Sequence, residues 1–154
     1  MNNERAILNL IAQYTHYVDQ AQFDKLGDLF AKGTLITAFN SPKGKEALVK
    51  HMENNLQVYP DGTLRTNHVT TNIVLNIDET AGTATAQSYL TLFQANPDNN
   101  FPLQAILTGT YHDKFAFADN EWYFLSRELV VGLVGDISNH AKSGSSESQT
   151  GGSN

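Results

Sequence analysis

The sequence contains no cysteine, and this absence removes several kinds of chemistry at once. Without thiols the chain cannot form disulfides, thiolate metal sites or a cysteine nucleophile. The absence also fits a reducing compartment, and we expect a cytoplasmic protein. The 154 residues must therefore be held together by one hydrophobic core, and a chain of this length is long enough to build one.

Basic charge and long apolar runs are scarce as well. The ten Lys and Arg residues are scattered, the net charge is −6, and no basic patch of the kind that binds nucleic acid stands out. No apolar run approaches the roughly 18 residues that a membrane-spanning helix needs. Residues 1–5 are not a basic region followed by an apolar stretch, so we expect no signal peptide. These features argue against nucleic-acid and membrane partners.

Metal and nucleotide motifs are missing too. The five histidines have neither i, i+4 nor H-E-x-x-H spacing, so we expect no metal. The chain has no Gly-rich phosphate loop, dinucleotide fingerprint or G-x-S-x-G elbow, and we expect no cofactor.

The first third of the sequence has a helical period. Apolar residues from Ile7 to Val18 recur every three or four positions, and Asn2 or Asn3 could cap this helix. A second short helix is predicted over 23–30 and a third over 45–56. A short strand over 34–39 is predicted between them.

The period then changes to two. Long strands are predicted over four ranges joined by short turns, namely 64–77, 83–94, 103–117 and 122–131. Helices followed by a meander of strands predict an α+β domain over residues 1–141, in which helices pack on a strongly curved antiparallel sheet and leave one pocket. Residues 142–154 are nearly devoid of apolar side chains and are predicted to be disordered.

Asp19 and His68 are the candidate catalytic pair. Asp19 falls late in the first helix, where it either ends the helix in solvent or lies at the rim of the pocket. His68 opens the first long strand, with Thr70, Asn72 and Val74 predicted on the same face, and is either a hydrogen-bonded strand residue or a general base. An imidazole titrates near neutral pH, and a carboxylate can orient it and stabilise its charged form.

Other polar aromatic residues are weaker candidates. Tyr14, Tyr17, Tyr89 and Tyr111 are candidate substrate-binding residues, because a tyrosine can donate a hydrogen bond to a ligand oxygen. The sequence does not separate them from the core aromatics. The remaining histidines are weaker candidates: His16 is expected to be solvated, His51 lies on the third helix, His112 could face either side of its strand, and His140 lies near the end of the fold.

Several motifs together resemble a known family. They are Tyr14-x-x-Tyr17-Val18-Asp19, the Phe23 to Phe30 stretch, Leu64-Arg65-Thr66-Asn67-His68, Gly109 to Asp113, Asp119 to Trp122, and Arg127. Over about residues 4–140 the chain resembles the SnoaL-like branch of the nuclear transport factor 2-like, cystatin-like superfamily. Within it, the chain is most similar to the scytalone dehydratase and hexachlorocyclohexane dehydrochlorinase families.

This resemblance implies a cone-shaped fold with Asp19 and His68 at the positions of an Asp–His dyad. The chain departs from the dehydratase at three places: Val18 stands where that family has a tyrosine, its second pocket histidine is replaced near Tyr89, and its Ser and Asn donors align with Gly109 and Tyr111. Scytalone itself is therefore not the expected substrate.

Two functions follow from the resemblance. The first is a cofactor-independent lyase or isomerase, eliminating water or a halide from a small hydrophobic cyclic or polyketide-like substrate. The alternative is a non-catalytic ligand-binding or assembly protein, such as a subunit like the β-chain of ring-hydroxylating dioxygenases.

Because neither set of alternating residues over 83–94 is charged, we also expect a homo-oligomer, a trimer or a dimer, joined through the sheet's outer face. The other possibility is a monomer whose C-terminal segment, up to His140, covers the sheet.

Overall fold

Three helices begin the fold. The computed structural model describes residues 2–151 and contains α1 (Asn3–Asp19), α2 (Phe23–Leu29) and α3 (Lys45–Asn55). Asn2 caps α1, because its side-chain oxygen accepts a hydrogen bond from the Arg5 N–H at 3.1 Å. The predicted apolar stripe of this helix is buried, and all three predicted helices are confirmed within two residues at each end.

Five strands form one mixed sheet in the order β1-β5-β4-β3-β2. They are β1 (Thr34–Ile36), β2 (Thr66–Asp78), β3 (Thr83–Asn96), β4 (Phe101–Ala118) and β5 (Glu121–Val134). The last four pair antiparallel as the predicted meander, while β1 pairs parallel to β5. Two 3-10 turns complete the fold, η1 (Pro97–Asn99) and η2 (Glu147–Gly151).

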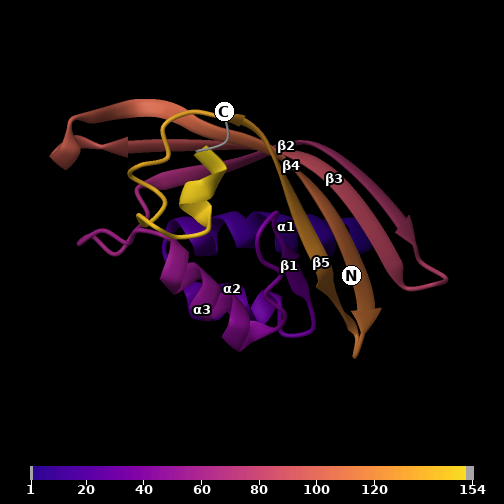
Figure 1. The fold of residues 1–154 in the computed structure, drawn as a ribbon. Coiled ribbons are helices and arrows are strands. Elements are labelled where there is room, and N and C mark those ends of the chain that lie inside the picture. Colours follow the sequence, from indigo (N-terminus) through magenta and orange to yellow (C-terminus); the bar gives the residue numbers. More distant parts are fainter. Residues whose placement is uncertain (1, 152–154) are drawn as a thin grey trace.

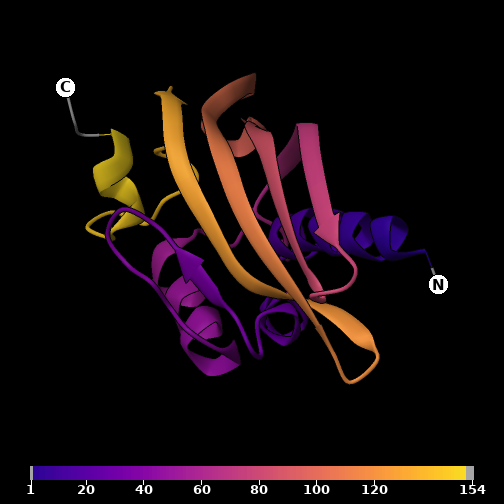
Figure 2. The ribbon, with the colours of Figure 1, turned by 90° about the vertical axis from the view of Figure 1, so that its right-hand side faces the viewer.

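The sheet curves over the helices (Figure 1), and Figure 2 shows α1 crossing behind its strands. Strand alternation decides what faces inward. Along β3 the residues from Ala84 to Leu92 at every second position are buried, whereas the intervening set from Thr83 to Phe93 faces outward. The buried set packs against α1 and the other helices in one core. The α+β class with helices on a curved sheet is therefore confirmed.

The alternation predicted for β2 is wrong beyond Thr71. A β-bulge between Thr71 and Val74 shifts the register against β3, and Asn72 has a positive φ of 55°. His68 and Thr70 keep one orientation, but Val74 is 60% exposed. An extra residue in a strand inverts the faces that follow it, and only the pairing with β3 reveals it. The first strand is also shorter than predicted, ending at Ile36.

The C-terminal segment runs back to α3 (Figure 1). Ala141 forms an isolated bridge with Leu56, and the Lys142 N–H donates to the Asn55 carbonyl at 2.8 Å. η2 lies against β5. The predicted disorder of 142–154 stays a prediction: its last three residues lie outside the described residues, and the earlier ones carry these contacts. Among the described helices, none is long and apolar enough to cross a membrane.

Candidate functional site

The structure brings Asp19 and His68 into direct contact. Asp19 is the last residue of α1, and its backbone carbonyl accepts the Leu64 N–H at 3.0 Å, which ties the helix end to the start of β2. The two side chains then meet, with Oδ1 of Asp19 and Nδ1 of His68 2.5 Å apart. Both are largely buried, with 8% and 7% of their side chains exposed. The alternative in which Asp19 faces solvent is wrong.

Three donors converge on the Asp19 carboxylate. Besides the His68 ring, the Thr66 hydroxyl donates to Oδ1 at 2.7 Å and the His68 backbone N–H donates to Oδ2 at 2.9 Å. Burial alone would raise the pKa of Asp19, but the hydrogen bonds and charge of His68, with help from Thr66, outweigh burial and hold the pKa below its usual range. Asp19 is therefore ionised at neutral pH.

An ionised carboxylate can only accept hydrogen bonds, and this fixes the state of the His68 ring. Nδ1 must carry the proton that it donates to Asp19, so in the neutral ring Nε2 is the unprotonated nitrogen. His68 lines a cavity beside Asp19. The pair therefore has the arrangement of a general base whose tautomer is held by a carboxylate.

The cavity lies between the helices and the inner face of the sheet and has a volume of about 50 Å³. Its apolar wall consists of Val18, Leu35, Met52, Leu56, Leu90, Leu92, Leu107 and Leu129. Its polar groups are Tyr14, Thr37, His51, His68, Tyr111, His140 and Glu147. Larger hollows occur elsewhere, including one of about 480 Å³ on the outer face of the sheet, but they contain no part of the dyad.

Two of the four predicted tyrosines are at the cavity. Tyr14 and Tyr111 are buried, with ring centroids 5.8 Å apart in an edge-to-face arrangement. Burial raises the pKa of Tyr14 to about 12 and that of Tyr111 well above its usual value, so both hydroxyls stay protonated and can donate.

A buried ion pair supports these tyrosines. Arg127 donates from Nε and Nη2 to the two carboxylate oxygens of Asp113 at 2.8 and 3.0 Å, and neither side chain is exposed. The Arg127 guanidinium lies 3.7 Å from the Tyr111 ring centroid and 4.4 Å from that of Tyr14. The pair therefore fixes both rings from the side of β4 and β5.

The other two predicted tyrosines lie elsewhere. Tyr17 is half-buried on α1, with the Lys25 ammonium 6.0 Å from its ring centroid, and it does not line the cavity. Tyr89 is 53% exposed, because it belongs to the outward-facing set of β3. Neither side chain lines the cavity that contains His68. Their role in substrate binding stays a prediction.

Three titratable cavity residues were not among the predicted site residues. His51 projects from α3, His140 from the segment after β5, and Glu147 from η2. The helical period of α3 could have placed His51 on the buried face one turn from Leu48, whereas no local pattern marks the other two. His16 and His112 are exposed.

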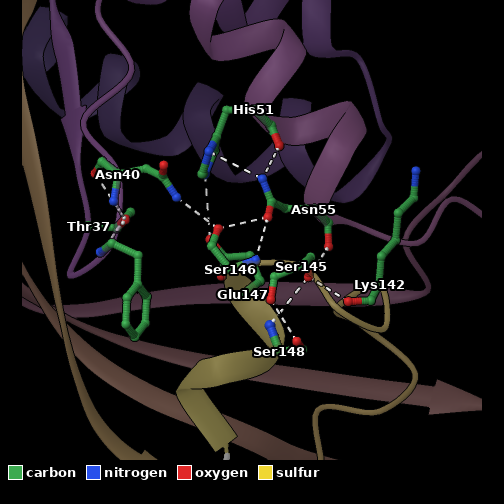
Figure 3. Close-up of polar contacts among 10 residues, drawn as sticks. Thr37, Asn40, His51, Asn55, Lys142, Ser145, Ser146, Glu147 and Ser148 are labelled. Carbon is green, nitrogen blue, oxygen red and sulfur yellow. Dashed lines mark hydrogen bonds and ion pairs between the residues drawn. The ribbon is translucent and has the colours of Figure 1, made fainter.

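The C-terminal segment lies beside α3 (Figure 3), and its residue Glu147 lines the cavity. The Ser146 N–H and hydroxyl both donate to the Asn55 side-chain oxygen, at 3.1 and 2.8 Å, and Asn40 donates to the Ser146 hydroxyl at 2.8 Å. These contacts bring the Glu147 carboxylate within 3.5 Å of His51 Nε2. In the part of the chain that the structure describes, no group of three or more His, Cys, Asp or Glu side chains is arranged to hold a metal ion.

Comparison with known proteins places this architecture. The model of the SnoaL-like domain family matches residues 1–128. The chain belongs to this family. The sequence-based resemblance to SnoaL-like domains is thereby confirmed. No curated protein sequence matches the chain.

Solved structures share the fold at low sequence identity. A proposed scytalone dehydratase from Novosphingobium aromaticivorans is 22% identical, with a TM-score of 0.68 over 86% of each chain. LinA is 17% identical, with a TM-score of 0.69 over 88% of this chain and 89% of its own. The β subunit of a proposed aromatic-ring-hydroxylating dioxygenase from N. aromaticivorans is 16% identical, with a TM-score of 0.65 over 84% and 90%. At these identities the similarity establishes the fold and leaves the function open.

Proposed function

We propose that this SnoaL-like domain is a cofactor-independent lyase or isomerase that acts on a small hydrophobic cyclic or polyketide-like substrate. The observation that carries the proposal is the buried hydrogen bond between Asp19 and His68 at the wall of a cavity. Nε2 of His68 removes a proton from carbon, while Asp19 keeps the ring oriented and stabilises its charged form. Elimination then expels water or a halide, whereas isomerisation returns the proton to another carbon.

The size of the cavity sets a condition on this function. A dry cavity that binds benzene has a volume of about 150 Å³, whereas this one has about 50 Å³. A cyclic substrate therefore requires the segment that carries Glu147 to move aside. That segment is held by polar contacts to Asn55 and Asn40 and has little apolar surface, which makes its displacement inexpensive.

Proton removal can be tested before the natural substrate is known. The protein is incubated in D2O with cyclohexanone and 2-tetralone, and separately with halogenated cyclohexanes, while α-deuteration and halide release are followed. His68→Ala and Asp19→Asn should each lower the active reaction by roughly 10²–10⁴-fold. His16→Ala, which changes an exposed histidine of α1, is the matched control and should behave as the wild type. A folded His68→Ala protein with full activity would contradict the role of His68 as the general base.

A non-catalytic role is the second candidate, and the small cavity favours it. The dioxygenase β subunit has the same fold, and a subunit of that kind would purify with a partner chain. Affinity purification from the native host separates the two roles. Stoichiometric recovery of an iron–sulfur-containing chain, together with no proton exchange, supports the assembly role, and recovery of the free domain supports the enzyme.

A further inference from the structure

His140 lies in a connecting segment whose backbone is held by several hydrogen bonds. Its carbonyl accepts the Gln57 N–H at 2.9 Å, and its own N–H donates to the Ile137 carbonyl at 3.0 Å. The Gln57 side-chain amide donates to the carbonyls of Ser138 and Ala141, at 2.8 and 2.7 Å. The backbone on both sides of His140 is therefore tied to the chain that follows α3.

The preceding residue, Asn139, is fixed by a second, buried network. Its carbonyl accepts hydrogen bonds from the Tyr59 hydroxyl and from the Gln94 amide, the latter at 3.1 Å. Its side-chain oxygen accepts the Asn96 and Asn99 amides at 2.8 and 3.0 Å. Two networks that converge on one short segment leave the His140 ring little freedom to move.

The ring itself is presented to the cavity that contains the dyad. His140 is 7% exposed, and its ring centroid lies 6.5 Å from that of His68. Its Nδ1 atom is buried and has no hydrogen-bond partner among the described residues. Four other side-chain atoms in this part of the chain share that condition, but none of their residues lines this cavity. Buried polar atoms are normally paired, so an unpaired nitrogen on a ring that lines this cavity is a candidate to bind a ligand atom.

The charge state of His140 suits a hydrogen-bonding role. Burial, with a smaller contribution from His68, lowers the pKa of His140 to about 4, although the carboxylates of Glu147 and Asp19 oppose the shift. His51, Tyr14 and Tyr111 are the other titratable rings at the same cavity. His140 is thus neutral near pH 7 and has one N–H donor and one acceptor nitrogen.

We propose that His140 donates a hydrogen bond to a carbonyl oxygen of the substrate while His68 removes the proton from the neighbouring carbon. This inference rests on the proposed function and narrows its substrate class to ketones, with β-hydroxy ketones for a dehydration. Both rings line the same cavity, with centroids 6.5 Å apart, so one C–C=O unit bound in the cavity can contact both of them. A halogenated cyclohexane has no oxygen for His140 to bind.

The electron and proton balance of the step is simple. The C–H electron pair forms the C=C bond of an enolate, the carbonyl π pair moves to oxygen, and the proton goes to Nε2 of His68. The negative oxygen is stabilised by the N–H of His140. In a dehydration the enolate re-forms its carbonyl and expels the β-hydroxyl group, which takes the proton from His68 and leaves as water.

The test compares two substitutions at one position in the full chain. His140→Phe keeps a ring of similar size without a donor, and His140→Gln keeps an amide donor. With 2-tetralone in D2O, we expect His140→Phe to lower α-deuteration by roughly 10²-fold, the effect of losing one donor to a developing oxyanion, and His140→Gln to retain most of it. His112→Phe, on an exposed histidine of β4, is the control and should match the wild type.

A direct measurement on the wild type removes the dependence on folding of the variants. In ¹⁵N-labelled protein, added 2-tetralone should shift the His140 ring resonances. A His140→Phe rate equal to that of the wild type, with His68→Ala inactive, overturns the inference and leaves the proposed function standing. A wild type that neither exchanges the ketone nor shows a shift at His140 overturns both.

Discussion

The buried pair of Arg127 and Asp113 allows a stability prediction in which two effects compete. Both side chains have zero exposure, and they form a bidentate contact beneath Tyr14 and Tyr111. Removing one partner leaves the other charge buried without compensation, which costs about 3–5 kcal/mol. We therefore expect Arg127→Met and Asp113→Asn each to lower the free energy of unfolding by roughly that amount.

The double variant should be more stable than either single one. Nη1 of Arg127 has no partner among the described residues, so the pair retains part of its desolvation cost. Replacing both charges by apolar side chains, in Arg127→Met/Asp113→Leu, removes that cost, and such replacements are often neutral or stabilising by about 1–4 kcal/mol. The double variant should therefore unfold within about 1 kcal/mol of the wild type or above it.

Urea unfolding followed by fluorescence measures these differences. Trp122 is the sole tryptophan of the sequence and is buried at the start of β5, so its emission reports on the sheet that carries the pair. With a denaturant slope of about 1–3 kcal/mol per molar urea, the single variants should shift the midpoint by roughly 2 M. Single substitutions that cost less than about 1 kcal/mol, or a double variant destabilised by the sum of the two, would refute the reasoning.

Three further predictions concern His140, Glu147 and assembly. The unfolded chain binds a proton at His140 near pH 6.5, whereas the folded chain binds it only near pH 4, so the free energy of unfolding should fall by about 3 kcal/mol as pH drops through that window. In urea unfolding measured from pH 7 to 4.5, His140→Phe should lack this pH-dependent contribution. Glu147→Ala should make 2-tetralone bind more tightly in a fluorescence or NMR titration. Its stability cost should be about 1 kcal/mol or less, because the contact to His51 is long and partly exposed. An unchanged affinity, equal to that of the exposed control Glu46→Ala, would contradict a covering role for Glu147. Light scattering should give two or three times the 17.0 kDa of one chain, because outward-facing apolar side chains such as Tyr89 and Leu133 are 53% and 76% exposed, whereas a mass near 17 kDa excludes the homo-oligomer.

Part of the candidate site was accessible from the sequence. The dyad of Asp19 and His68 was identified by its motifs, and the structure brings these side chains into contact. Tyr14 and Tyr111 also reach the cavity, whereas Tyr17 and Tyr89 do not. Tyr89 lies outside the cavity because it belongs to the outward-facing set of β3. Strand alternation separates two sets of residues, but only packing against α1 decides which set faces the core.

The local elements could be predicted from the sequence, because helical and strand periods depend on residues within a few positions of one another. The sequence predicted three helices and four long strands, and hence the α+β class. The tertiary structure alone decided the parallel pairing of β1 with β5, the bulge at Asn72, and the meeting of His51, His140 and Glu147 around one cavity. These features depend on contacts between residues far apart in the chain, such as Gln57 with His140 and Asn55 with Ser146. Short polar segments have no period that records such contacts, and their positions follow only from the hydrogen bonds that the folded core offers them.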